Sequence, residues 1–257
     1  MTVSFERVFK AYTPRGREPI VALEDVSLGL DKGQLVVLLG PSGCGKTTLL
    51  KLLAGFEDPT SGRVTVGGQL VRQPGPDRGI IFQSPTLFPW LTALNNVRYG
   101  PRVRGLTDKA VTERAKAVLD SVGLADFHDH LPHNLSGGMQ QRVAIARVLI
   151  NDPQIVLADE PFAALDEYTR RAMQALFLRT VADRSRTLLF VTHSIEEAVF
   201  LADRIFIMTP RPGRIRQCID IGMPRPRERS RREFLDLMGQ IFEIVSQDFT
   251  ATVAEIN

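Results

Sequence analysis

The sequence predicts an α/β fold in which a mostly parallel sheet carries helices on both sides. Apolar strand patterns alternate with amphipathic helix patterns along most of the chain. The apolar stretch 34–39 leads into a glycine-rich turn and then into the start of a helix. A largely helical stretch, residues 89–150, interrupts this alternation, so we expect a helical subdomain inserted into the sheet core.

The glycine-rich turn predicts a site for nucleotide phosphates. It reads Gly-Pro-Ser-Gly-Cys-Gly-Lys-Thr-Thr over residues 40–48 and fits G-x-x-x-x-G-K-[ST]. Glycines let backbone N–H groups approach phosphate oxygens, and the positive end of the following helix favours an anion there. Strand, loop and helix in this order are typical of a P-loop NTPase (RecA-like) core. The expected nucleotide-binding residues are Gly40, Pro41, Ser42, Gly43, Cys44, Gly45, Lys46, Thr47 and Thr48.

Three side chains of this loop have separate expected roles. Lys46 should reach the β- and γ-phosphates, and the Thr47 hydroxyl should ligate Mg²⁺. The Cys44 thiol should lie beside the phosphates, where Lys46 and the helix N-terminus would favour a reactive thiolate. The second cysteine, Cys218, lies far along the chain.

Composition indicates an ordinary globular protein. The chain has 257 residues, of which 44% are hydrophobic and 24% charged, enough for one large domain. We expect no membrane-spanning segment and no signal peptide, and two cysteines fit a reducing cytoplasm. The net charge is +3, with arginines concentrated between residues 211 and 232. A solvated basic tail and a contact with acidic lipid or an acidic partner both remain open for that segment.

The N-terminal third predicts an antiparallel β part. Residues 3–9 and 20–30 read as strands, and residues 63–66 and 69–71 read as a hairpin around Gly-Gly. Tyr12 is expected in the intervening loop, where its ring could stack on a nucleotide base. A further short strand, residues 79–82, ends at Gln83. The apolar, proline-broken stretch 84–91 is compatible with buried loop packing and with an exposed patch for a partner protein.

The central segment predicts two helices and a second anion site. Residues 107–122 place apolar side chains on one helical face. Ser136 is the expected N-cap of the next helix, which opens with Gly137, Gly138, Met139 and Gln140. Glycines in a first helical turn lower helix stability, so we infer that a ligand approaches the backbone there.

Two further strands end in residues suited to catalysis. Residues 154–158 form an apolar strand followed by Asp159 and Glu160, which are expected to hold Mg²⁺ and to polarise a water. Ligands of parallel α/β sheets bind at this carboxyl end of the strands. After a loop (161–166) and a helix (170–181), the strand 187–192 ends at His193 in the same manner.

The last part of the chain predicts one more strand and a C-terminal helix. Ser194 and Glu197 form a capping box for a helix, and residues 204–208 read as a strand. Turns rich in proline and arginine follow. The final helix presents an apolar face, which we expect to pack on its own domain or, second, on another subunit; its members are Phe234, Leu237, Met238, Ile241 and Val245.

Taken together, these motifs resemble the ATPase subunit of ATP-binding cassette (ABC) transporters over nearly the whole chain. Residues 40–48 resemble Walker A, residues 155–159 Walker B, and residues 135–142, Leu-Ser-Gly-Gly-Met-Gln-Gln-Arg, the signature sequence. The signature sequence is specific to this family. Gln83 is similar to the Q-loop glutamine, residues 164–166 to the D-loop and His193 to the switch histidine.

The resemblance implies a mechanism. Two copies would face each other head to tail, with each ATP between Walker A of one copy and Ser136, Gly137, Gly138 and Gln140 of the other. Glu160 would be the catalytic carboxylate, and Gln83 and His193 would act in catalysis as γ-phosphate sensors. Asp166 would link the two ATP sites, Tyr12 would stack on adenine, and Thr47, Gln83 and Asp159 would hold Mg²⁺.

The resemblance also implies partners and location. Residues 82–91 and 210–214 resemble the nitrate/sulfonate/taurine/bicarbonate importer group. The expected partners are a second copy, two transmembrane permease subunits and, indirectly, a periplasmic or lipid-anchored solute-binding protein, with no nucleic acid. The expected location is the cytoplasmic face of a bacterial inner membrane. Importers of a thiamine precursor or an aromatic acid, a soluble ABC ATPase outside transport, and a module that binds ATP without hydrolysis are the alternatives.

The expected organisation is a single ABC ATPase domain over residues 1–257. Its nucleotide-binding core comprises residues 1–88 and 151–210, its helical subdomain residues 89–150, and its C-terminal extension residues 211–257.

Overall fold

The computed structural model describes residues 2–16, 18–181 and 186–254, with the backbone alone for 248–254. The chain forms two compact units. Unit 1 consists of Met1–Pro74 with Thr187–Asn257, and unit 2 of Gly75–Arg186. The described part of the chain holds no helix long and apolar enough to cross a bilayer.

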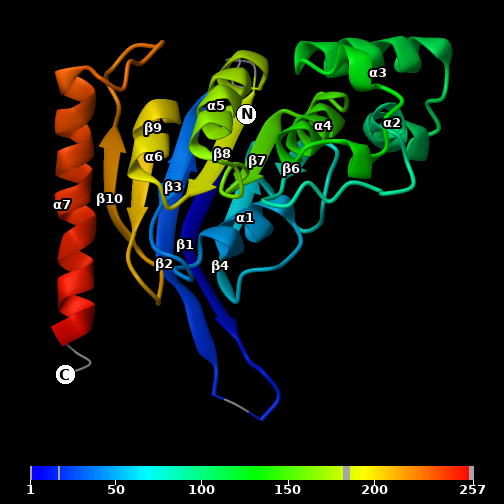
Figure 1. Ribbon diagram of the computed structural model, residues 1–257. Helices are drawn as coiled ribbons and strands as arrows, with labels where there is room; N and C mark the ends of the chain where they lie inside the picture. The colour runs from blue at the N-terminus through cyan, green and yellow to red at the C-terminus, as the bar shows by residue number, and fades with distance from the viewer. Residues whose placement is uncertain (1, 17, 182–185, 255–257) are drawn as a thin grey trace. The chain divides into compact units, whose positions relative to one another are not determined.

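Unit 1 contains the predicted antiparallel β part (Figure 1). Its strand order is β2-β1-β4-β5, formed by β1 (Val3–Tyr12), β2 (Ile20–Leu30), β4 (Ser61–Val66) and β5 (Gln69–Leu70). The alternation is clear in β2, where Val26, Leu28 and Leu30 are buried and the residues between them are exposed. β1 is longer than predicted, so Tyr12 is its last residue, paired with Ile20, rather than a loop residue.

The predicted parallel sheet of unit 1 is built around β3 (Leu35–Leu39), whose five residues are all buried. On one side β3 pairs with β8 (Thr187–Thr192), and on the other with β9 (Arg204–Met208), both in parallel. Burial on both faces explains the uninterrupted apolar run in β3. β10 (Ile215–Asp220), which the sequence did not predict, adds an antiparallel edge to β9.

Three helices belong to unit 1. α1 (Lys46–Ala54) buries four leucines, namely Leu49, Leu50, Leu52 and Leu53. α6 (Ile195–Leu201) contacts the long C-terminal helix α7 (Arg232–Ala254), which runs beside β10 in Figure 1. Phe234 and Ile241 of α7 are buried, so these two residues of the predicted apolar face pack on its own unit, whereas Leu237, Met238 and Val245 are half-buried.

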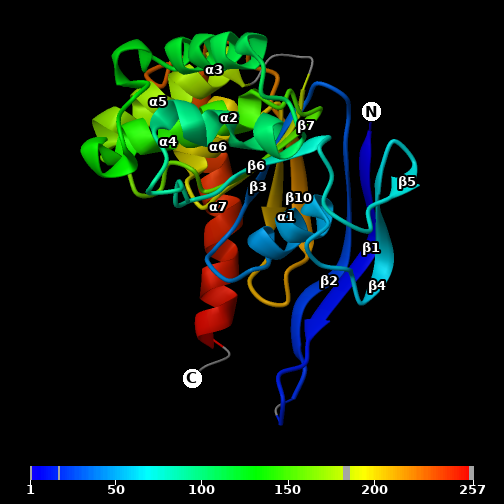
Figure 2. The same cartoon turned by 90° about the vertical axis from the view of Figure 1, so that its right-hand side faces the viewer.

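Unit 2 combines a short parallel strand pair with helices (Figure 2). β6 (Arg78–Ile81) and β7 (Ile155–Asp159) pair in parallel, and α2 (Ala93–Val103), α3 (Lys109–Ser121) and α4 (Gly137–Leu149) pack together. Two single 3₁₀ turns (Ala125–Phe127 and Pro132–Asn134) connect α3 to α4, and α5 (Glu167–Thr180) follows β7. α3 buries Ala115 and Leu119 on its predicted face. α2 was not predicted as a separate helix.

The arginine-rich segment of unit 1 is folded rather than a solvated tail. Arg227 is 8% exposed, and its guanidinium donates to the carbonyl oxygens of Val199, Phe200 and Ala202 at 2.6–3.2 Å and to that of Met223 at 3.1 Å. It thereby caps the C-terminus of α6, where unpaired carbonyls need donors. Burial lowers the pKa of Arg227 to about 10.

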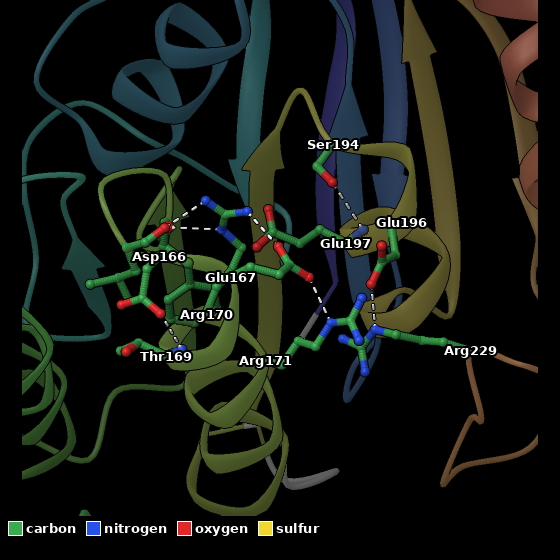
Figure 3. A network of polar contacts seen from close by, with 11 residues as sticks. Asp166, Glu167, Thr169, Arg170, Arg171, Ser194, Glu196, Glu197 and Arg229 are labelled. Atoms are coloured by element: carbon green, nitrogen blue, oxygen red, sulfur yellow. Dashed lines mark hydrogen bonds and ion pairs between the residues drawn. The ribbon is translucent and has the colours of Figure 1, made fainter.

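The arginine two positions further on binds the other end of the same helix. Arg229 Nε lies 2.5 Å from Glu196 Oε1, a contact drawn in Figure 3, and its guanidinium stacks over the Phe200 ring at 3.7 Å. Arg227 and Arg229 both contact α6, which lies far from them in sequence. Neither a solvated tail nor a surface for acidic lipid or an acidic partner describes these two side chains.

Candidate functional site

The residues expected to bind phosphate form a turn at the carboxyl end of β3. The turn ends at Gly45, whose φ of +101° lies in the left-handed region. A Cβ there would lie 2.6 Å from Leu23 Cδ2 and 2.9 Å from the Ala22 carbonyl oxygen. The close approach of β2 therefore requires glycine at position 45. This gives a steric reason for the second glycine of the motif in this chain.

Lys46 projects into the turn that precedes it. Lys46 is 4% exposed, and its ammonium donates to the carbonyl oxygens of Gly40 at 2.7 Å and Pro41 at 2.8 Å. These bonds hold a positive charge within the loop, at the N-terminus of α1. The first turn of α1 also contains Thr47, exposed, and Thr48, half-buried.

Cys44 differs from the sequence expectation. Its side chain is 1% exposed, and its sulfur packs inside the loop, 3.9 Å from Lys46 Nζ. Burial raises the pKa of the Cys44 thiol and outweighs the opposing effect of the Lys46 ammonium. The expectation of a reactive thiolate beside the phosphates is therefore wrong, because the thiol is part of the core.

Tyr12 lies next to the phosphate loop. Its hydroxyl donates to Glu57 Oε2 at 2.6 Å and lies 3.4 Å from Thr48 Oγ1 in α1. Lys10 holds the same carboxylate at 3.3 Å and places its ammonium 5.0 Å from the centre of the Tyr12 ring. These contacts fix the ring orientation. Glu57 belongs to no motif, so sequence reasoning did not select it.

His193 reaches the same edge of the sheet as the phosphate loop. Leu39 and Thr192 are partners in the parallel register of β3 and β8, so Gly40 and His193 each follow directly after them. Both line a cavity of about 700 Å³ together with Pro41 and Ser42. The far wall of the cavity comes from α7, through Phe242, Val245 and Ser246. The C-terminal helix thus borders the phosphate loop, which the sequence did not indicate.

In unit 2, Gln83 and the Asp159–Glu160 pair follow two neighbouring parallel strands. Ile81 of β6 pairs with Ala158 of β7, so Gln83 and Glu160 each lie two residues beyond that pair. Asp159 and Glu160 are half-buried. Glu160 has a φ of +43°, which is rare outside glycine and costs about 1–3 kcal/mol. Arg7, Asp25, Thr86 and Asp152 have similar φ values, so this strain supports a catalytic role for Glu160 only together with its place at the end of β7.

The predicted signature helix begins as expected. Ser136 caps α4 by accepting a hydrogen bond from the Met139 N–H at 3.3 Å, and both Ser136 and Gly137 are exposed. The Gln140 amide donates to the Pro132 and Leu135 carbonyls at 2.9 and 3.1 Å, so it shapes the turn before the helix. Its neighbour Gln141 is 2% exposed and donates to the Phe82 carbonyl at 3.1 Å. Gln141 therefore connects α4 to the residue before Gln83.

Asp166 is the N-cap of α5 and accepts from the Thr169 N–H at 3.0 Å (Figure 3). This backbone hydrogen bond lowers the pKa of Asp166 and keeps it ionised. Arg170 braces the preceding loop by donating to the Leu165 carbonyl at 2.6 Å and pairing with Glu167 at 2.9 Å. Sequence reasoning missed Arg170 because the contacts that brace the loop go to the backbone carbonyls of Phe162 and Leu165.

The apolar stretch 84–91 has no regular structure, yet two polar side chains fix it. Asn96 is fully buried and bonds both the N–H and the carbonyl of Phe88 at 2.8 and 3.1 Å. Arg147 donates to the Pro85 and Thr86 carbonyls at 3.0 and 2.9 Å. Trp90 remains 72% exposed, beside the Phe88 ring at 5.7 Å. The stretch is thus a rigid loop that presents an aromatic side chain.

Comparisons with known proteins agree with this site. The profile of the family described as ABC transporter matches residues 23–163. An uncharacterized ABC transporter ATP-binding protein of Methanocaldococcus jannaschii is 47% identical over 229 residues, which are 89% of this chain and 86% of that protein. The taurine import ATP-binding proteins TauB of Ruegeria pomeroyi and Burkholderia pseudomallei (strain 1710b) are 45% and 49% identical, over 83% and 82% of this chain and 80% of each relative.

Solved structures agree as well. A dimeric ATP-binding cassette in a post-hydrolysis state, bound to ADP and Pi, has a TM-score of 0.75 at 35% identity and covers 86% of this chain and 100% of its own. A dimeric bacterial ABC transporter cassette has a TM-score of 0.76 at 34% identity with the same coverage. The predicted P-loop NTPase fold is confirmed. The chain belongs to the ABC transporter family, as an importer subunit whose ATPase activity is coupled to transport.

Proposed function

We propose that this subunit hydrolyses MgATP to drive the uptake of a small solute with an acidic group, with taurine or a related sulfonate as the first candidate. The observation that carries the hydrolytic part is the joint placement of Lys46, His193 and the phosphate loop at one edge of the parallel sheet of unit 1. The names of the curated relatives favour taurine. Nitrate and bicarbonate are further candidates, because residues 82–91 and 210–214 also resemble importers of these solutes.

Each site residue has a role in this proposal. The loop N–H groups and Lys46 bind the β- and γ-phosphates, and Tyr12 stacks on adenine. Glu160 orients and polarises the attacking water, and His193 and Gln83 sense the γ-phosphate. Asp166 links the two ATP sites.

The residues proposed for Mg²⁺ have suitable donor chemistry. Thr47, Gln83 and Asp159 offer a hydroxyl, an amide oxygen and a carboxylate, and Mg²⁺ prefers oxygen ligands and few of them from protein. When bound, the ion neutralises phosphate charge. Thr47 is exposed and Asp159 half-buried at a strand end, so neither is committed to the core.

A second copy of the chain completes the proposed site. Helices α1 and α4 each offer an N-terminus suited to anions, and they are separate in sequence. In a head-to-tail dimer, Ser136, Gly137 and Gly138 of one copy would cover the ATP held by the phosphate loop of the other. Both solved relatives are dimeric, which supports this arrangement.

The aromatic loop 84–91 is the proposed docking site for a permease subunit. It is apolar and follows Gln83 directly, and Asn96 and Arg147 hold it in one shape. Through it, ATP-dependent changes at Gln83 would reach two permeases from the cytoplasmic face of the inner membrane. A solute-binding protein would act on the opposite side.

The proposal separates into two tests. Glu160→Gln should retain ATP binding, lose most hydrolysis and accumulate as a nucleotide-bound dimer in size-exclusion chromatography, whereas Lys46→Ala should lose nucleotide binding. Hydrolysis by Glu160→Gln at the wild-type rate would require another group to activate the water. For the solute, the subunit should be assembled with its own permease in vesicles, and uptake of labelled taurine, nitrate and bicarbonate compared. If none of the three solutes is taken up in an ATP-dependent manner, the proposed solute class is excluded.

A further inference from the structure

We infer that Arg211, in the turn 209–214 after β9, is a positioning residue for the phosphate-binding loop. Its guanidinium donates through both Nε and Nη2 to the Gly43 carbonyl oxygen, each at 3.3 Å. Gly43 is separated from it by most of the chain, yet both residues lie in unit 1. The inference rests on the proposed nucleotide site and adds a residue that none of the motifs of that site contains.

The turn is itself fixed to β2. The Gly213 N–H donates to the Ala22 carbonyl, and the Glu24 N–H donates to the Gly213 carbonyl, both at 3.0 Å. Thr209 closes the turn, since its hydroxyl donates to the Pro212 carbonyl and accepts from the Arg214 N–H. The guanidinium of Arg211 is therefore held by a rigid support, although the side chain itself is exposed.

A second contact joins the same turn to the next peptide of the loop. A Cβ on Gly213 would lie 1.9 Å from the Cys44 carbonyl oxygen, a distance that no side chain tolerates. Only glycine lets the turn approach this closely. The turn thus touches two consecutive carbonyls of the phosphate loop, one through Arg211 and one through Gly213.

Because the peptide group is planar, holding a carbonyl of the loop also orients the N–H group of the next residue. In a trans peptide the C=O of one residue and the N–H of the next point in opposite directions. Fixing the Gly43 carbonyl directs the Cys44 N–H inward, where it donates to the Pro41 carbonyl at 3.4 Å. Fixing the Cys44 carbonyl directs the Gly45 N–H away from the turn 209–214. Arg211 and Gly213 therefore hold the backbone of the loop in one shape before an anion binds, without touching the anion.

Preorganisation predicts an effect on affinity rather than on the chemical step. Without Arg211 the loop must be ordered when nucleotide binds, so the KM and Kd for nucleotide rise while kcat stays near the wild-type value. The two bonds are long and solvent-exposed, so we expect a rise of about fivefold for Arg211→Gln. Arg211→Lys, with one charged donor in place of the fork, should recover part of the loss.

The chain supplies matched controls. Arg214 lies on the same turn but pairs with Glu24 at 2.8 Å instead of the phosphate loop. Arg214→Gln removes the same charge and should leave nucleotide affinity within twofold of wild type, as expected for an exposed pair. For the glycine contact, Gly213→Ala should raise the Kd at least as much as Arg211→Gln. Gly222→Ala, where a Cβ would meet no atom within 4 Å, should not change it.

The experiment measures the Kd of ADP and ATP by calorimetry, steady-state KM and kcat, and thermal midpoints for these variants in the full chain. Higher Kd and KM with unchanged kcat for Arg211→Gln and Gly213→Ala, and not for their controls, support the inference. The midpoint should stay near wild type for Arg211→Gln, whereas the clash of the added Cβ with the Cys44 carbonyl also lowers it for Gly213→Ala. Equal affinities in Arg211→Gln and wild type overturn it, and so does a fall confined to kcat or midpoint. If wild type itself binds no nucleotide, or binds it equally well as Lys46→Ala, the proposed nucleotide site fails instead.

Discussion

Removing the guanidinium of Arg227 should destabilise unit 1 by about 3 kcal/mol. Four carbonyl oxygens share this buried donor, three of them at the C-terminal end of α6. Breaking a buried charged contact usually costs about 3–5 kcal/mol because the remaining partners stay desolvated. We expect the lower end, since burial already lowers the pKa of Arg227 to about 10 and its removal relieves that desolvation. A loss of this size lowers the thermal midpoint by roughly 6–12 °C.

The assay must report on unit 1. The single tryptophan, Trp90, belongs to unit 2, so intrinsic fluorescence follows the other part of the chain. Calorimetry, with amide hydrogen exchange over residues 195–202, measures the stability of α6 directly. Arg231→Ala is the matched control, because its ion pair with Glu228 is 67% and 60% exposed and should contribute less than about 0.5 kcal/mol. Indistinguishable effects of Arg227→Ala and Arg231→Ala would refute the capping role.

Three further predictions concern the sites. Burial pushes the pKa of Glu57 upward, but hydrogen bonds from Tyr12 and Lys10 overcome this and leave it below its usual value. The ionised Glu57 carboxylate therefore stabilises the folded state above about pH 4.5, and this effect is lost as the pH falls through the lower pKa of the folded state. Glu57→Gln should flatten the pH dependence of the free energy of urea unfolding between about pH 5 and pH 3. An unchanged pH profile would contradict the role given to these hydrogen bonds. Alkylation followed by mass spectrometry should modify exposed Cys218 before Cys44, whose thiol is buried and whose pKa burial raises; the reverse order requires an open loop. Trp90→Ala should weaken assembly with the permease while ATP affinity of the isolated subunit stays unchanged, and normal assembly and uptake assign the loop to packing alone.

Much of the fold could be predicted because local patterns determine it. The strands 187–192 and 204–208 match β8 and β9 residue for residue, since each is a short apolar run with polar residues on both sides. Ser136 and Ser194 cap their helices as their spacing to the following residues indicates. The residues that carry the predicted chemistry also lie at strand ends and helix starts, the positions that sequence patterns identify most reliably.

The remaining features depend on contacts that no local pattern encodes. α2 contains Gly100 and Pro101, so its sequence has a low helix propensity. The buried amide of Asn96 holds it in place through hydrogen bonds to the loop 84–91. β10 has mixed polar composition because it is an edge strand, and none of its residues is buried. The inward orientation of Cys44 follows from the packing of the loop. Arg211 and Arg227 donate to carbonyl oxygens of residues that are distant in sequence. The arginine-rich composition of the segment 211–232 therefore suggested only surface charge.

The central position of β3 has a consequence for how the protein is made. Both of its neighbours, β8 and β9, are encoded after the whole of unit 2. During synthesis at ~5–20 residues per second, this apolar strand therefore waits for several seconds without partners. Unit 2 is contiguous in sequence and has been synthesised completely before β8 is made. The phosphate loop follows β3 and cannot take its final form until that strand is paired. The nascent chain thus cannot bind nucleotide early, and β3 is the segment that most needs protection from aggregation on the ribosome.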